Sequence, residues 1–192
     1  MSRSVSAVDS ARLGYGAVAG AVAFLINYAL AYVLWTATSF PETAEGILRE
    51  FAFNQVADWV FAGWLLYGAH FVDIEFSNLF GFPVGRATLN AVSVVDQTST
   101  SLLYVVVPAV LIAAGIALAR AHGAVSFSDG AITGAATAIG YFPLVAIGIY
   151  LFGTTGQLGE ASPVFGMAII LAGVVYPTLL GALGGVIATT ID

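Results

Sequence analysis

One histidine and two carboxylates close together follow the second long apolar run of this sequence: His70, Asp73 and Glu75. On a continuing helix, His70 and Asp73 would lie on one face and could pair. One imidazole and two carboxylates are also ligand types that a divalent metal accepts, with His122 as a distant fourth ligand. The simpler interpretation is that His70 ends a helix, where a cation suits the helix dipole, and that the acids face solvent. We favour the simpler interpretation and predict no metal ion and no cofactor.

Two more polar residues lie inside apolar runs. Asn27 stands near the middle of the first run, and a buried amide in lipid needs a hydrogen-bond partner, so Asn27 should face the other helices. An interhelical hydrogen bond is favoured over a contact with a substrate. Asp58 stands near the entrance of the second run, beside Trp59. A carboxylate is tolerated at the headgroup level but is costly deeper in the bilayer, so we favour the headgroup level for Asp58.

Three later apolar runs each contain a proline with a tyrosine close by: Tyr104 and Pro108, Tyr141 and Pro143, Tyr176 and Pro177. Pro143 and Pro177 fall near the middle of their runs. A proline inside a helix frees the carbonyl of the residue four positions earlier and bends the helix. Broken helices build midplane binding sites in transporters, although a proline within a span more often only shapes the packing.

The elements that hold these residues belong in a membrane. The chain is 59% hydrophobic and only 8% charged, with a mean hydropathy of +0.96, whereas a soluble domain carries about 25% charged residues. So few charges cannot cover a surface in water, so we expect membrane lipids around the chain. The chain has no cysteine, which excludes disulfides and thiolate metal sites, and no lysine, which excludes a retinal Schiff base. Sequence motifs of zinc proteases, serine hydrolases and nucleoside triphosphatases are absent, and we predict that the chain is not an enzyme.

The apolar runs predict an all-α membrane protein: a bundle of five transmembrane helices with a small extramembrane β-hairpin between helices two and three, in one domain over residues 1–192. The predicted spans cover about residues 14–37, 52–71, 102–119, 131–152 and 163–188. The first span is expected to be retained, because no secretory cleavage site follows it. Gly-x-x-x-Gly pairs begin at Gly16, Gly130 and Gly181, and such faces let another helix approach closely. We therefore expect a homo-oligomer or a membrane-protein partner at these faces. The acidic net charge of −6 argues against nucleic acid.

Three segments that connect the predicted spans have sequence patterns that predict their structure. Residues 72–76 alternate apolar and acidic side chains with the period of a strand, and residues 87–95 are rich in β-branched residues. These patterns predict a hairpin of residues 72–78 with 88–95, a cap of about residues 72–95 outside the bilayer. Residues 39–51 predict an amphipathic helix at the membrane surface. Residues 153–162 read as a loop of turn residues.

Five spans would place the two termini on opposite sides of the membrane. With the N-terminus in the cytoplasm, Arg3, Arg12 and Arg86 would lie inside, against Arg49 and Arg120 outside. This count is nearly balanced. If the arginines that flank the first span are given greater weight in this count, a cytoplasmic N-terminus is favoured.

Four short stretches together resemble an uncharacterised family of haloarchaeal multi-pass integral membrane proteins. They are Trp64 with Tyr67-Gly68-Ala69-His70-Phe71-Val72-Asp73, Leu103-Tyr104-Val105-Val106-Val107-Pro108, Gly140-Tyr141-Phe142-Pro143-Leu144, and Val174-Val175-Tyr176-Pro177 with Gly181. The resemblance covers most of the chain and implies the cytoplasmic membrane of a haloarchaeon, in keeping with an acidic composition without lysine. It implies no activity, and no functional residue is carried over from it.

Two functions follow from these expectations. We favour a structural or accessory membrane component that binds partners through its glycine faces and its hairpin. The alternative is a small transporter or channel-like protein with a midplane site near the proline-broken helices, which predicts a polar cavity that reaches the midplane. An enzyme at the membrane surface would need His70 and His122 to lie close together, and we expect the spans to separate them.

Overall fold

The computed structural model of the chain describes residues 2–39, 55–77, 87–156 and 159–191. Its long helical segments are α1 (Ser2–Thr36), α6 (Leu103–Ala121) preceded by α5 (Thr98–Ser101), α7 (Phe127–Ala135) followed by α8 (Ala138–Leu151), and α10 (Tyr176–Ala188) preceded by α9 (Phe165–Met167) and the π-helical η2 (Ala168–Val175). The shorter helices are α3 (Asp58–Ala69) and α4 (Ala91–Val95).

Four helical segments among the described residues are long and apolar enough to cross a membrane: Arg12–Thr36, Thr98–Ala121, Phe127–Leu151 and Phe165–Ala188. They coincide with the first, third, fourth and fifth predicted spans. Four such helices are compatible with a membrane protein. The predicted count of five spans is wrong, because the second predicted span, residues 52–71, does not form a helix of membrane length in the described part of the chain.

Helix α3 takes the place of that span and is too short to cross a bilayer. It has 12 residues, or about 18 Å, against about 30 Å of hydrocarbon. All of its residues from Val60 to Ala69 are buried, and a helix that is apolar on every side suits the interior of a bundle. It climbs beside α8, with Gly63 at the level of Phe152 and His70 at the level of Tyr141. The helix therefore begins at one end of the bundle and ends inside it.

A four-stranded antiparallel sheet closes the same end of the bundle, in the order β2-β1-β4-β3. The predicted hairpin is confirmed where β1 (Ile74–Ser77) pairs with β2 (Ala87–Leu89), with Glu75 opposite Thr88. Ile74 and Phe76 are buried and the alternate positions half-buried, as the period of two predicts. The predicted second strand ends early, because the Asn90 side chain accepts hydrogen bonds from the amides of Val92 and Ser93 and starts α4.

The segment predicted as a loop forms the other half of the sheet. Strands β3 (Thr154–Gly156) and β4 (Gly159–Pro163) pair with each other, and β4 also pairs with β1. The prediction missed them because Gly, Thr and Ser are typical of turns, while here the neighbouring strand supplies the hydrogen bonds. The amphipathic helix predicted at residues 39–51 falls mostly outside the described residues.

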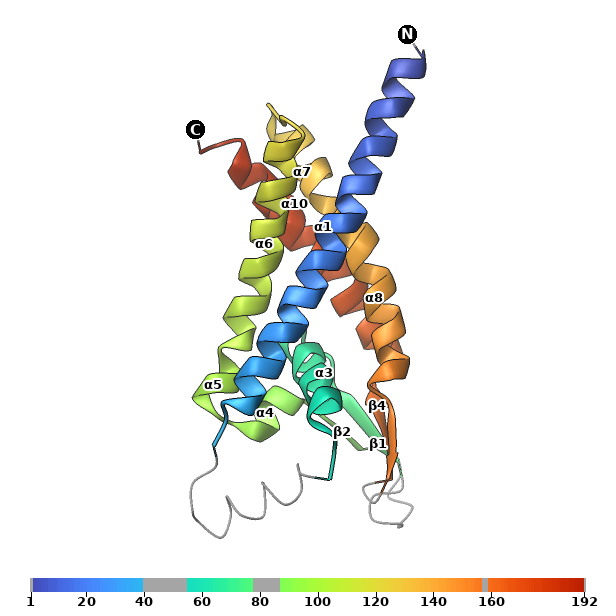
Figure 1. The fold of residues 1–192 in the computed structure, drawn as a ribbon, viewed down its shortest axis with the longest axis vertical. Coiled ribbons are helices and arrows are strands. Elements are labelled where there is room, and N and C mark those ends of the chain that lie inside the picture. The colour runs from blue at the N-terminus through green and yellow to red at the C-terminus, as the bar shows by residue number, and fades with distance from the viewer. Residues whose placement is uncertain (1, 40–54, 78–86, 157–158, 192) are drawn as a thin grey trace.

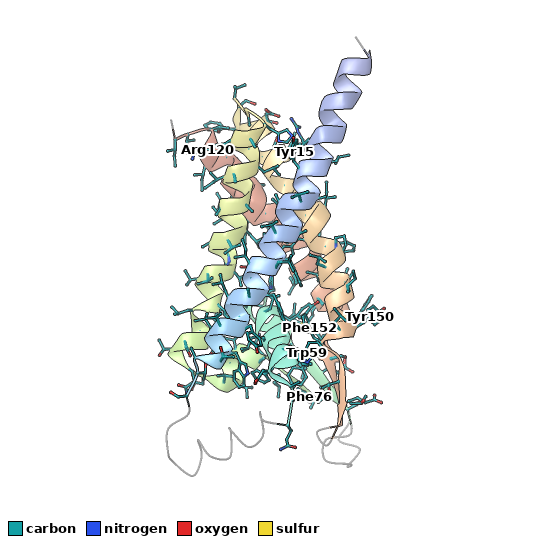
Figure 2. The ribbon with its side chains drawn as sticks, in the orientation of Figure 1. Tyr15, Trp59, Phe76, Arg120, Tyr150 and Phe152 are labelled. Atoms are coloured by element: carbon teal, nitrogen blue, oxygen red, sulfur yellow. The ribbon has the colours of Figure 1, made fainter. Side chains whose placement is uncertain are left out.

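Both termini lie at the end of the bundle opposite the sheet (Figure 1). The four membrane-length helices among the described residues agree with this arrangement, which differs from the expectation that the termini lie on opposite sides. Tyr15 and Arg120 lie toward the terminal end, while Trp59, Phe152 and Tyr150 lie toward the sheet end (Figure 2). Aromatic residues near both ends of the spans are typical of the two membrane–water interfaces.

The glycine faces pack inside the chain. A Cβ on Gly16 or Gly20 would meet the backbone of residues 136–141, and Gly130 and Gly134 lie against Gly181 and Gly185. Such contacts let α1 cross α7–α8, and α7 cross α10, at short distance. A second copy or another partner at these faces stays a prediction.

Candidate functional site

Three polar side chains from three separate elements meet inside the apolar core. Asn27 Nδ2 lies 3.3 Å from the Tyr141 hydroxyl, which lies 2.9 Å from His70 Nε2. On the other side of the imidazole ring, His70 Nδ1 lies 2.7 Å from the Leu66 carbonyl oxygen. Asn27, His70 and Tyr141 are each at most 1% exposed. We call these three residues the buried triad.

The buried triad lies at mid-depth in the bundle. Asn27 stands near the middle of the span Arg12–Thr36, and Tyr141 stands near the middle of Phe127–Leu151. Tyr176, near the middle of the fourth span, places its ring 4.9 Å from the imidazole ring, centroid to centroid. Polar side chains at this depth are costly unless they pair with one another, and the triad pairs all three residues.

Irregular backbone gathers around the triad. Helix α3 ends at Ala69, and Phe71 turns the chain back toward the sheet with a left-handed φ of 58°. The long helix α7–α8 is interrupted at 136–137, and Pro143 follows Tyr141. The π-helical η2 meets α10 at Tyr176 and Pro177. Non-helical backbone at membrane depth is tolerated where protein covers it or where it lines a cavity, so these breaks converge on one protected place.

One end of the Asn27 amide has no partner. Its Oδ1 is buried and accepts no hydrogen bond, while its Nδ2 donates to Tyr141. Turning the amide over would give Oδ1 the Tyr141 hydroxyl and leave Nδ2 alone. Either orientation therefore leaves one buried polar atom unsatisfied, which costs about 1–3 kcal/mol and calls for an explanation.

The remaining predicted site residues lie apart from the triad. Asp58 is exposed in the first turn of α3, where its carboxylate accepts a hydrogen bond of 2.9 Å from Trp35 Nε1. Asp73 is half-buried, and its backbone oxygen accepts from the Val164 amide. His70 and Asp73 do not share a helix face, because the helix has ended between them.

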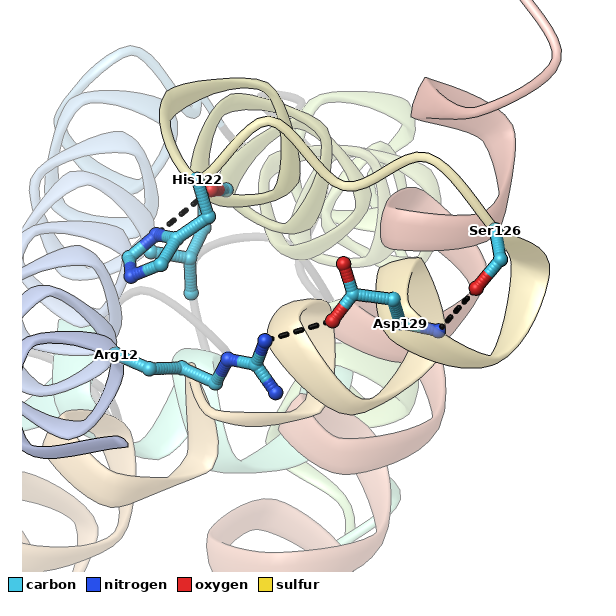
Figure 3. Close-up of polar contacts among 5 residues, drawn as sticks. Arg12, His122, Ser126 and Asp129 are labelled. Carbon is cyan, nitrogen blue, oxygen red and sulfur yellow. Dashed lines mark hydrogen bonds and ion pairs between the residues drawn. The ribbon is translucent and has the colours of Figure 1, made fainter. Parts of the chain in front are cut away.

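A second polar group lies at the terminal end of the bundle, and Figure 3 shows its contacts. Arg12 donates to Asp129 over 2.6 Å, and the Ser126 hydroxyl accepts from the Asp129 amide. His122 packs edge-to-face on Tyr15 at this end, so the structure separates it from His70. Within the described ranges, no three His, Asp or Glu residues lie close enough together to hold a metal ion.

Residues 2–192 match a family of unknown function, DUF7978. The chain belongs to this family. The match extends over almost the whole DUF7978 chain, in keeping with the resemblance to an uncharacterised family. No curated protein and no solved structure matches the chain.

Two polar contacts next to the triad of this DUF7978 chain were not predicted from the sequence. The Thr137 hydroxyl lies 2.9 Å from the Gly134 oxygen and 3.0 Å from the Pro177 oxygen, and it ties α7–α8 to α10. The Tyr67 hydroxyl donates to the Val145 oxygen and ties α3 to α8. Nothing in the local sequence singles out this threonine or this tyrosine, since Pro177 and Val145, the partners that make the ties between helices, are distant in the sequence.

Proposed function

We propose that this chain is a small transporter or channel-like membrane protein whose substrate passes the buried triad, and that it is not an enzyme. The observation that carries the proposal is the end of α3 at mid-depth, where His70 joins the Asn27–Tyr141 hydrogen bond. Half-length helices that end at the midplane beside broken spans are typical of transporter binding sites. A bundle held together only by apolar packing has no need of this arrangement.

The triad is closed in this conformation. The transport interpretation predicted a polar cavity at mid-depth, and Asn27 instead meets a packed contact with Tyr141. Passage therefore requires a movement that parts the triad. Helix α3 and the turn at Phe71 are suited to such a movement, because they end inside the bundle and the left-handed turn is strained.

Reconstitution into liposomes tests transport. Ionic current is measured in planar bilayers, and uptake of small neutral polar solutes by stopped-flow light scattering. We expect flux above that of empty membranes for the wild type and at least about tenfold less for Asn27→Leu. Tyr150→Phe is the matched control, because Tyr150 is 78% exposed and far from the triad. Wild-type protein that passes neither ions nor solutes would contradict the proposal.

A structural or accessory component is the second candidate, and the charge of the sheet end favours it. Five acidic residues lie there: Asp58, Asp73, Glu75, Asp96 and Glu160. Among the described residues of this end there is no arginine. A partner with a basic surface would suit it. Photo-crosslinking from the exposed Thr155 in native membranes should then give one defined adduct, weakened when Asp96 and Glu160 are replaced by their amides.

The charges also support an orientation and a location. Arg12 and Arg120, the arginines whose side chains the structure describes, both lie at the terminal end, where Arg12 pairs with Asp129 and Arg120 donates to the Ile191 oxygen. Arginine is enriched on the cytoplasmic side, so we place both termini in the cytoplasm and the sheet outside the cell. An acidic composition without lysine suits molar salt, where the Debye length is about 3 Å, and we propose a haloarchaeal cytoplasmic membrane.

A further inference from the structure

The hydrogen bonds of His70 fix which ring nitrogen carries the hydrogen. A carbonyl oxygen only accepts, so Nδ1, which lies 2.7 Å from the Leu66 oxygen, must carry a hydrogen and donate it. In the neutral ring Nε2 then has a free lone pair, and it faces the Tyr141 hydroxyl at 2.9 Å. The chain of donation runs from Asn27 through Tyr141 to His70 and ends on the backbone.

The contacts leave no room for an ordinary ligand between these groups. Both distances within the triad are hydrogen-bond distances, and none of the three residues is more than 1% exposed. A metal ion, a water molecule or an organic solute would need the side chains to separate. A proton adds no heavy atom and therefore fits the closed site as it stands.

The unpartnered oxygen of Asn27 gives the site a second arrangement. A proton on Nε2 would make that nitrogen a donor, so the Tyr141 hydroxyl would accept from it and need a new acceptor for its own hydrogen. Turning the Asn27 amide over would bring Oδ1 to Tyr141 and supply that acceptor. The same heavy atoms can therefore carry the two hydrogen bonds between Asn27, Tyr141 and His70 in either direction, while Nδ1 keeps its bond to Leu66. The unpaired Asn27 oxygen is the atom that the second direction uses.

The groups around the imidazole are neutral. Tyr141 of α8 and Tyr176 of α10 contact the ring, Tyr67 stands one turn earlier on α3, and α6 contributes Tyr104, which stacks on the adjacent Phe71. Within the described residues, no carboxylate forms an ion pair with His70. An imidazolium here has no counter-ion, so proton uptake would disfavour the closed bundle.

We propose that the buried triad is a proton-binding site, with His70 Nε2 as the acceptor, and that a proton is the ion that the transport function moves or uses. This inference rests on the proposed function and names its ion. The uptake balances simply: a hydronium ion gives its proton to Nε2 and becomes water, while the Tyr141 hydrogen turns from His70 to Asn27. No other bond forms or breaks.

The two histidines of the chain make a direct test practical. In His122→Gln protein labelled with ¹⁵N-histidine in lipid nanodiscs, only His70 gives imidazole signals. We expect Nδ1 to stay protonated while Nε2 changes from a bare to a protonated nitrogen as the pH falls from about 8, above the ordinary pKa of histidine of about 6.5, toward the pH of unfolding. Asn27→Leu should lower the midpoint by about one pH unit, because the displaced Tyr141 hydrogen then lacks an acceptor. Tyr150→Phe should leave the midpoint unchanged.

A bare Nε2 down to the pH of unfolding would overturn the proton site, and so would equal midpoints for Asn27→Leu and Tyr150→Phe. Proton uptake by liposomes that contain a pH-sensitive dye separates this inference from the transport proposal. If Nε2 titrates but the wild type moves neither protons nor solutes, the proton site stands and transport is contradicted. If solutes cross while Nε2 does not titrate, transport stands and the proton site is wrong.

Discussion

The Tyr141 hydroxyl lies between two buried polar groups, and both lose a partner if it is removed. We expect Tyr141→Phe to lower the free energy of unfolding by about 1–3 kcal/mol, because Asn27 Nδ2 and His70 Nε2 would both stay buried without a hydrogen bond. Reversible unfolding in mixed micelles measures the change. The same substitution at the exposed Tyr150 should shift it by no more than about 0.5 kcal/mol.

A double variant separates the hydrogen bond from the loss of packing. Asn27→Leu removes the amide and keeps a similar volume, so Tyr141→Phe should cost less in the Asn27→Leu background than in the wild type. Equal costs in the two backgrounds would mean that the Asn27–Tyr141 contact does not stabilise the closed bundle.

The ion pair at the terminal end should behave differently from the triad. Arg12 and Asp129 are 2.6 Å apart, but their side chains are 21% and 35% exposed, so water and salt screen them. We expect a coupling free energy below about 1 kcal/mol from the cycle of Arg12→Gln and Asp129→Asn, measured by unfolding. The coupling free energy should fall further as salt is added. A coupling free energy above about 1 kcal/mol that does not change with salt concentration would contradict this prediction.

At the scale of elements, the crossing of α1 over α7–α8 depends on glycine residues, which have no side chain to hold the helices apart. A Cβ on Gly20 would clash with the backbone oxygen of Thr137 and the amide of Tyr141, neither of which can turn aside as a flexible side chain can. We expect Gly20→Ala to lower the free energy of unfolding by about 1–3 kcal/mol, the usual cost of overpacking. Gly14→Ala, on the same helix with open space around it, should be neutral or stabilising by up to about 1 kcal/mol.

Hydropathy predicted four of the spans and the first hairpin, because a lipid-facing helix and an alternating strand leave clear patterns in the residues. It misread residues 52–71 because Trp64, Leu65 and Leu66 have the same hydropathy whether lipid or protein surrounds them. Asn27 was predicted to face the bundle, since an amide in lipid needs a partner. Its partner is Tyr141 because of the way in which α1 packs on α8. The residues near Asn27 in the sequence do not predict this packing.

At the scale of the whole molecule, the two ends of the bundle carry different charges among the described residues. The end with the sheet carries acidic side chains from five described positions, and the terminal end carries Arg12 and Arg120 together with Asp129, which pairs with Arg12. We propose that this difference in charge favours one direction of insertion. It would also attract hydrated cations to the sheet end, because carboxylates there raise their local concentration.

The last prediction tests this topology with single cysteines, which the cysteine-free chain accepts without a background signal. Thr155 lies in the sheet, and Val125, 91% exposed, lies between α6 and α7 at the terminal end. In sealed right-side-out vesicles, a membrane-impermeant maleimide should label Thr155→Cys at once and Val125→Cys only after detergent. Affinity tags at the two termini should both resist external protease, because four spans return the chain to the side where it began. Five spans would expose one tag and protect the other, and labelling of Val125→Cys in intact vesicles would reverse the orientation.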